Sequence, residues 1–124
     1  MACVLIADDD PIVRELLSAW LFMSGYDCVE AADGVEALEL IRSGPVDLVI
    51  CDLMMPRLDG AGLVEALRAQ PATRRLPVLI LTVRSRAADA AALLDAGADD
   101  YVRKPIDWAE LRARIERQLR RLAA

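Results

Sequence analysis

Acidic residues follow two of the apolar runs in this sequence of 124 residues. The run 4–7 leads into Asp8–Asp10, and the run 48–51 leads into Asp52. Carboxylates that lie close together repel one another, and a hard divalent cation such as Mg²⁺, which prefers oxygen ligands, relieves this repulsion. A carboxylate can also attack phosphorus and form an aspartyl-phosphate. These residue types therefore favour phosphoryl chemistry assisted by a metal ion.

Two further residues can complete such a site. Thr82 ends the apolar run 77–82, and Lys104 follows the run 99–103. Lys104 is the only lysine among fifteen basic residues, which indicates that a compact ammonium group is needed there. An ammonium group cancels charge on phosphoryl oxygens, and a threonine hydroxyl donates a hydrogen bond to them. Each residue alone has an ordinary structural explanation, and only their joint placement carries the functional interpretation.

The elements that position these residues are predicted from the hydrophobic periodicity, in which strands and helices alternate. The predicted strands are Ala2–Ala7, Tyr26–Ala31, Val46–Cys51, Pro77–Thr82 and Asp99–Arg103, and the predicted helices are Pro11–Ser24, Gly34–Ser43, Gly60–Gln70, Arg86–Ala96 and Trp108–Leu122. Asp10 stands before a proline that can open a helix, so Asp10 is expected to cap that helix and not to bind metal.

Five strand–helix units in a row predict an α/β fold with a doubly wound five-stranded parallel sheet and five helices. We take its strand order to be the known flavodoxin-like order 2-1-3-4-5. Residues 1–122 form one domain, and residues 123–124 are its C-terminal end or the start of a linker. Ligands of such sheets bind beyond the carboxyl ends of the strands. If the first and third strands are neighbours, as in that order, Asp8, Asp9 and Asp52 meet in one crevice, with Thr82 and Lys104 at the same rim.

The composition limits the classes of function. A net charge of −5 disfavours nucleic-acid binding by this segment, and the absence of histidine excludes histidine-based catalysis and metal ligation. The apolar runs are too short to cross a bilayer. Three cysteines, each within an apolar run and without an export signal before them, predict buried thiols in a cytoplasmic protein.

The sequence resembles the receiver domain of bacterial response regulators over essentially its whole length. The stretches that carry the resemblance are VLIADDDPIVRELL (4–17), DLVICDLMMPRLDG (47–60), PVLILTVRS (77–85) and GADDYVRKP (97–105). The resemblance implies a module of two-component phosphorelay signalling that takes a phosphoryl group from a histidine kinase or a histidine phosphotransfer protein. Its only turnover would be transfer to itself and slow self-hydrolysis, so it is not expected to be a metabolic enzyme.

The resemblance also implies a role for each site residue. Asp52 would be the phospho-acceptor. Mg²⁺ would be held by Asp9, Asp52 and the backbone carbonyl of Met54, and Asp8 would act through a metal-bound water. Lys104 would pair with the phosphoryl group, and the peptide bond that follows it, to proline, is expected to be cis.

The output of the switch follows from the same resemblance. Thr82 would move toward the phosphoryl group, and Tyr101 would rotate inward behind it. This change would select between two packings of the surface formed by 86–96, 99–103 and 108–122, which a partner reads.

Three residues beside the site are expected to tune its chemistry. The position after the switch threonine is usually small in this family, whereas here it is Val83. We expect its side chain to slow phosphoryl entry, water attack or both. Met54 and Arg84 flank the pocket and are expected to set the lifetime of the phosphorylated state.

The C-terminal third is most similar to the winged-helix transcription-factor subgroup, through ADDY (98–101) and ELRARIERQLRR (110–121). The similarity implies a homodimer through the switch surface, with an ion pair between Asp100 and Arg114 across the two-fold axis. It also implies an effector domain beyond the C-terminus.

Two alternatives stay open on the sequence alone. A small phosphatase of the haloacid-dehalogenase type would use Asp8 as its nucleophile, and its residue types are matched by Asp8, Asp10, Thr82, Lys104 and Asp99–Asp100. That alternative leaves Asp52 without a role. The second alternative is a receiver-like docking module that no longer accepts phosphate.

Overall fold

The residue composition of each strand matches its central or edge position in the sheet. The structure, a computed structural model, describes residues 1–83 and 87–123. Its strands are β1 (Cys3–Ala7), β2 (Asp27–Ala31), β3 (Leu48–Asp52), β4 (Val78–Thr82) and β5 (Asp100–Arg103). The three central strands, β1, β3 and β4, are nearly continuous apolar runs, as expected of parallel strands covered on both faces. The edge strands β2 and β5 mix apolar and charged residues.

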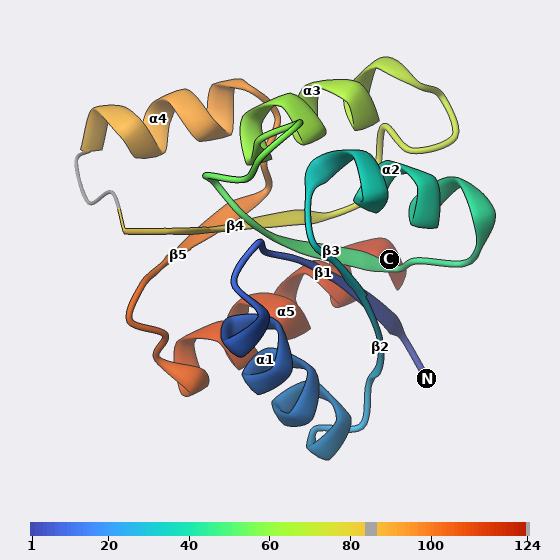
Figure 1. Ribbon diagram of the computed structural model, residues 1–124, viewed down its shortest axis with the longest axis vertical. Coiled ribbons are helices and arrows are strands. Elements are labelled where there is room, and N and C mark those ends of the chain that lie inside the picture. Colours follow the sequence, from blue (N-terminus) through green and yellow to red (C-terminus); the bar gives the residue numbers. More distant parts are fainter. Residues whose placement is uncertain (84–86, 124) are drawn as a thin grey trace.

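The sheet has the strand order β2-β1-β3-β4-β5, and all of its pairs are parallel. The predicted doubly wound fold is therefore confirmed. Because β1 lies beside β3, with Ala7 opposite Cys51, the residues that follow these strands come out at the same edge of the sheet. In Figure 1 this carboxyl edge lies at the left, and both chain ends lie toward the opposite edge.

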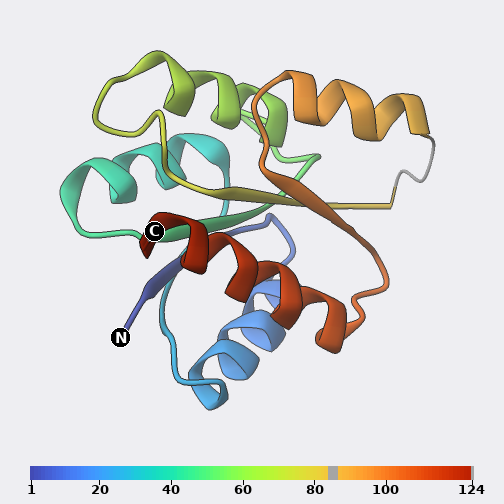
Figure 2. The same cartoon turned by 180° about the vertical axis from the view of Figure 1, so that it is seen from behind.

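The five helices divide between the two faces of the sheet. They are α1 (Pro11–Met23), α2 (Gly34–Ser43), α3 (Gly60–Ala69), α4 (Ala87–Asp95) and α5 (Trp108–Ala123). Helices α2, α3 and α4 cover one face, and α1 and α5 cover the other, as Figures 1 and 2 show. No helix in the described ranges 1–83 and 87–123 is both long and apolar enough to span a bilayer.

Alternate strand residues build the two cores, because successive side chains of a strand point to opposite faces. Val4 and Ile6 pack with α1 and α5, whereas Leu5 and Ala7 pack with the helices of the other face. All four side chains are fully buried. This double burial fixes the register of β1, since a slip by one residue would exchange the two faces.

Helix starts are set by aspartates. Asp10 accepts a hydrogen bond from the Ile12 N–H at 2.9 Å, and Asp33 accepts one from the Glu36 N–H at 2.8 Å. Asp59 does the same for α3, from the Gly62 N–H at 2.8 Å. These bonds satisfy backbone donors that a helix leaves free at its N-terminus, and they tie each helix to the loop before it.

A stacked pair of aromatic rings joins α1 to α5. The ring centroids of Trp20 and Trp108 lie 5.0 Å apart, with 39° between the ring planes. The guanidinium carbon of Arg112 lies 5.7 Å from the centroid of the Trp20 ring, close enough for a cation–π contact. Arg112 also donates to the Ser24 hydroxyl at 3.4 Å, so α5 is tied to the end of α1.

Most predicted strands and helices are shifted by one or two residues at an end, and three points concern residues discussed above. Strand β3 includes Asp52, which stands opposite Leu81, whereas the prediction ended that strand at Cys51. The helix predicted from Arg86 begins at Ala87, and Arg86 itself lies outside the described residues. Of the three thiols predicted to be buried, only that of Cys51 is, since Cys3 and Cys28 are partly exposed near the start of their strands.

Candidate functional site

The buried end of the site is Asp8, whose side chain is inaccessible to solvent. Burial raises the pKa of its carboxyl above the ordinary value. Two contacts oppose this shift: the Asp10 N–H donates to Oδ1 of Asp8 at 2.9 Å, and the Lys104 ammonium lies 3.3 Å from Oδ2. Asp10 thus supports Asp8 through its backbone, while its own carboxylate caps α1, as predicted.

Asp52 is the last residue of β3 and is partly exposed. The first residue of α3, Gly60, packs closely against this strand end. A Cβ at Gly60 would lie 2.7 Å from the Asp52 carbonyl oxygen, so only glycine allows this approach without a shift. The Met54 N–H donates to Oδ1 of Asp52 at 3.4 Å.

Three carboxylates meet at this edge of the sheet. Asp8, Asp9 and Asp52 can each place a carboxylate oxygen within 4.8 Å of the others, and their exposure rises from buried Asp8 to exposed Asp9. Hard oxygen donors with one side open to water fit Mg²⁺, which usually keeps several waters and takes one or two carboxylates. The convergence predicted for these three residues is confirmed. That the Met54 carbonyl is a ligand, and that Asp8 acts through water, stay predictions.

Lys104 places its ammonium between two of these carboxylates. Its Nζ lies 3.3 Å from Oδ2 of Asp8 and 3.4 Å from Oδ2 of Asp52. Burial by itself would lower the pKa of Lys104, but the attraction of these two carboxylates outweighs it, and the pKa is raised. The Lys104–Pro105 peptide bond is cis, as predicted. One cation is therefore shared by two acids that would otherwise repel each other.

Of the two predicted switch residues, Thr82 lies at this edge and Tyr101 lies within β5. Thr82 ends β4 with only 3% of its surface exposed, and the next residue, Val83, is 75% exposed. Tyr101 stands opposite Ile80 in the sheet and is partly buried against the core on the α2–α3–α4 face. Their movement and the effect of Val83 stay predictions. Arg84, expected to flank the pocket, lies outside the described residues.

The predicted partners Asp100 and Arg114 are paired within one chain. Arg114 donates to Oδ2 of Asp100 at 2.6 Å and to Glu110 at 3.1 Å. These contacts raise the pKa of Arg114 despite its partial burial. An Asp100–Arg114 pair between two protomers would require the pair within each chain to open first. The pair between protomers stays a prediction.

The late acidic pair that the phosphatase alternative needs lies at the wrong edge of the sheet. Asp99 precedes β5, and its carboxylate accepts hydrogen bonds from the Val78 N–H and from Arg68, each at 2.8 Å. This is the amino edge, opposite the one that carries Asp8. The geometry therefore gives Asp99 a structural role, at the edge of the sheet opposite Asp8.

Sequence reasoning missed an ion pair that holds the loop after Asp52. Arg57 has a φ of 66°, and its guanidinium lies 2.8 Å from Oδ2 of Asp33. The Gly34 N–H also donates to the Leu58 carbonyl at 3.2 Å. Nothing in the local sequence signals these contacts, because they join segments that only the fold brings together.

Comparison with known proteins agrees with this geometry. The family model for the response regulator receiver domain matches residues 4–116. Response regulator MprA of Mycobacterium sp. (strain KMS) is 48% identical over 118 residues, which cover 95% of this chain and 50% of MprA. The chain thus spans about half the length of that relative.

Two solved structures have the same fold. The chemotaxis response regulator CheY4 of Vibrio cholerae is 33% identical, with a TM-score of 0.90 over 96% of this chain and 99% of CheY4. The receiver domain of sensor histidine kinase PA1611 from Pseudomonas aeruginosa PAO1, which holds a magnesium ion in its active-site cleft, is 31% identical, with a TM-score of 0.87 over 95% and 97%. With its acidic crevice, its strand order and this match over most of its length, the chain belongs to the response regulator receiver domain family.

Proposed function

We propose that Asp52 accepts a phosphoryl group from a phosphohistidine of a histidine kinase or a histidine phosphotransfer protein, with Mg²⁺ bound beside it. The observation that carries the proposal is the meeting of three carboxylates and one ammonium at a partly open strand end. The magnesium ion in the receiver domain of PA1611 supports the choice of metal. Asp9, Asp52 and the Met54 carbonyl would hold the ion, and Asp8 would contact it through water.

Different side chains of the site would have different roles in the phosphoryl transfer. A carboxylate oxygen of Asp52 forms the new P–O bond as the P–N bond of the donor breaks. Lys104, already 3.4 Å from Asp52, lies where it can neutralise a phosphoryl oxygen. Bound Mg²⁺ would supply the remaining positive charge and relieve the repulsion among the acids. Asp8 is buried, so its charge is screened little and favours the cation.

The phosphoryl group would act on Thr82 and Tyr101, and through them on the surface of α4, β5 and α5. Both residues suit this role, since Thr82 ends the strand beside Asp52 and Tyr101 lies on the adjacent strand. A hydrogen bond from the Thr82 hydroxyl to a phosphoryl oxygen would favour one of two packings of this surface. Tyr101 is only partly buried, which leaves it room to move.

The wider setting is also part of the proposal. We assign one receiver domain to residues 1–122, with 123–124 as its end or the start of a linker, in a cytoplasmic protein. Because MprA is about twice as long as this chain, an effector domain beyond the C-terminus is the expected context. Homodimerisation through α4, β5 and α5 would exchange the internal Asp100–Arg114 pair for pairs between protomers.

The test is phosphorylation by a small acyl phosphate such as acetyl phosphate, followed by intact mass and site mapping after borohydride reduction. We expect one phosphate on Asp52, formed only with Mg²⁺ and absent from Asp52→Asn. Label on Asp8 would support the phosphatase alternative. If no residue is labelled, even with a phosphohistidine donor, the result would contradict the proposal and favour the docking-module alternative.

A further inference from the structure

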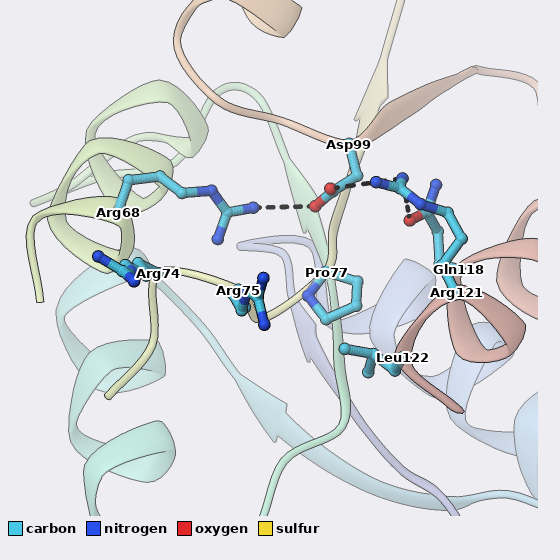
Figure 3. A pocket seen from close by; sticks show the side chains of 8 residues that line it. All are labelled: Arg68, Arg74, Arg75, Pro77, Asp99, Gln118, Arg121 and Leu122. Atoms are coloured by element: carbon cyan, nitrogen blue, oxygen red, sulfur yellow. Dashed lines mark hydrogen bonds and ion pairs between the residues drawn. The ribbon is translucent and has the colours of Figure 1, made fainter. Parts of the chain in front are cut away.

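A second charged site lies at the amino edge of the sheet, far from Asp52. Figure 3 shows a hollow between the end of α3, the loop before β4 and the last turns of α5. Its volume is about 400 Å³, within the range of small-molecule pockets. We call it the arginine pocket, and its lining residues are Arg68, Arg74, Arg75, Pro77, Asp99, Gln118, Arg121 and Leu122.

The arginine pocket has an excess of positive charge. Four guanidinium groups line it against the single carboxylate of Asp99, although the chain as a whole has a net charge of −5. Asp99 is already engaged, since Arg68 and the Val78 N–H both lie 2.8 Å from its Oδ2. The nearest approach of Arg121 to this carboxylate is 3.9 Å. Asp99 thus neutralises little of the remaining charge.

Two of the four arginines have no structural explanation. The carboxyl end of a helix favours cations, which accounts for Arg68 on α3 and Arg121 on α5. Arg74 and Arg75 follow α3 in a loop and are exposed. Neither makes an ion pair with any residue in the ranges 1–83 and 91–122, whose side chains the structure describes. Adjacent like charges without a counter-charge cost free energy, so a ligand that supplies the counter-charge would be favoured.

The loop that carries these two arginines is held in place. Arg68 donates to the carbonyls of Leu76 at 2.7 Å and Thr73 at 3.4 Å, and the Thr73 hydroxyl donates to the Leu67 carbonyl at 2.7 Å. The site is therefore largely formed before a ligand arrives, which lowers the entropic cost of binding.

The opposite wall offers a buried polar group. Gln118 is only 2% exposed, and its amide oxygen accepts a hydrogen bond from Arg121 at 3.0 Å. The amide nitrogen of Gln118 carries two further N–H donors. A donor on one wall and guanidinium groups on the other suit an anion with several oxygens.

We propose that the arginine pocket binds a small molecule with two adjacent phosphate groups, either free pyrophosphate or a nucleoside diphosphate. Guanidinium groups match phosphate oxygens with two parallel hydrogen bonds. One phosphate group would meet Arg74 and Arg75, and the other would meet Arg121 and Gln118. A protein partner would need roughly 800 Å² of surface on each side. The charges instead surround one hollow, which favours a small ligand.

Calorimetric titration with inorganic pyrophosphate tests this inference. Mg²⁺ is left out, so that the acidic crevice cannot hold phosphate. We expect saturable binding of one pyrophosphate per chain, weakened about tenfold or more in the Arg74→Gln/Arg75→Gln double variant. Arg117→Gln removes an exposed arginine of α5 outside the pocket and serves as the matched control, with affinity within about twofold of the parent. Asp52→Asn should bind like the parent, because the two sites are separate.

Parallel titrations with ADP and with a short polyglutamate peptide identify the class of ligand. Tighter binding of ADP than of pyrophosphate would identify a nucleotide, and equal binding would identify the diphosphate group alone. Amide-resolved NMR should show the Gln118 side-chain signals shifting with either ligand. Absence of saturable pyrophosphate binding, equal loss in Arg117→Gln, or tighter binding of the peptide would each overturn the proposal.

Discussion

The two edges of the sheet carry opposite charge patterns. At the carboxyl edge, three carboxylates surround one ammonium, and at the amino edge four guanidinium groups surround one carboxylate. Each edge is fixed by a shared counter-ion: Lys104 bridges two acids at one, and Asp99 joins a backbone amide to an arginine at the other. One scaffold therefore presents an acidic edge, which we propose binds Mg²⁺, and a basic edge, which we propose binds a diphosphate.

Removing the bridging cation should have the largest effect. We expect Lys104→Ala to lower the rate of Asp52 phosphorylation by about 100-fold, because an ammonium poised for the phosphoryl oxygens is lost. The rate is measured with acetyl phosphate and saturating Mg²⁺. In the Arg74→Gln/Arg75→Gln variant the rate should stay within about twofold of the parent. A common loss in both variants would show that the two edges are not independent.

Removing the corresponding anchor of the amino edge should cost stability and leave the chemistry intact. Arg68→Ala breaks the pair with Asp99 and frees the carbonyls of Gly97 and Leu76, to which Arg68 donates at 3.0 and 2.7 Å. We expect a loss of roughly 2–4 kcal/mol in the free energy of unfolding by urea. Arg117→Ala, the exposed control, should change it by less than about 0.5 kcal/mol. Similar losses in both variants would refute the anchoring role.

The stability contributed by Asp33 should depend on pH, because the hydrogen bonds and the ion pair of its carboxylate lower its pKa. The pKa of Asp33 is lowered from 3.8, first by the hydrogen bond from the Glu36 N–H and then by Arg57. Ionised Asp33 therefore stabilises the fold above about pH 4, and this stabilisation is lost as the pH falls through the lowered pKa. Asp33→Asn should be less stable than the parent at pH 7, with a gap that narrows below pH 4. A gap independent of pH in urea titrations would contradict this.

Val83 should have the smallest effect. Its exposed side chain follows the switch threonine, and we expect Val83→Ala to raise the rates of phosphorylation and self-hydrolysis about two- to fivefold, on the scale of small steric changes. Rates are followed by mass spectrometry of the phosphorylated chain. Unchanged rates would remove the steric explanation.

The carboxyl edge could be predicted from the sequence, and the amino edge could not. Asp8, Asp9 and Asp52 each follow or end an apolar run, so strand order alone brings them together. The arginine pocket depends on loop and helix ends whose relative placement no periodicity encodes. The one available signal was the group of three arginines at 68, 74 and 75, facing Asp99 once the sheet order is known.

The contacts that stabilise the loop after Asp52 could not be predicted from the sequence either. Arg57 adopts a positive φ that is uncommon for its residue type, and its partner Asp33 lies 24 residues away along the chain. The distinction between Cys51 and the partly exposed Cys3 and Cys28 likewise follows from position along a strand. Residue type and apolar context are the same for all three.

The pairing of Trp20 with Trp108 gives the molecule a built-in optical reporter. The chain has only these two tryptophans, and both belong to one tilted stack between α1 and α5. Indole emission and near-ultraviolet dichroism therefore sense separation or sliding of those two helices, and the Arg112 guanidinium beside the Trp20 ring adds to the sensitivity of the signal. A change in the indole emission on phosphorylation would mean that the perturbation has crossed the sheet to the face away from α2, α3 and α4.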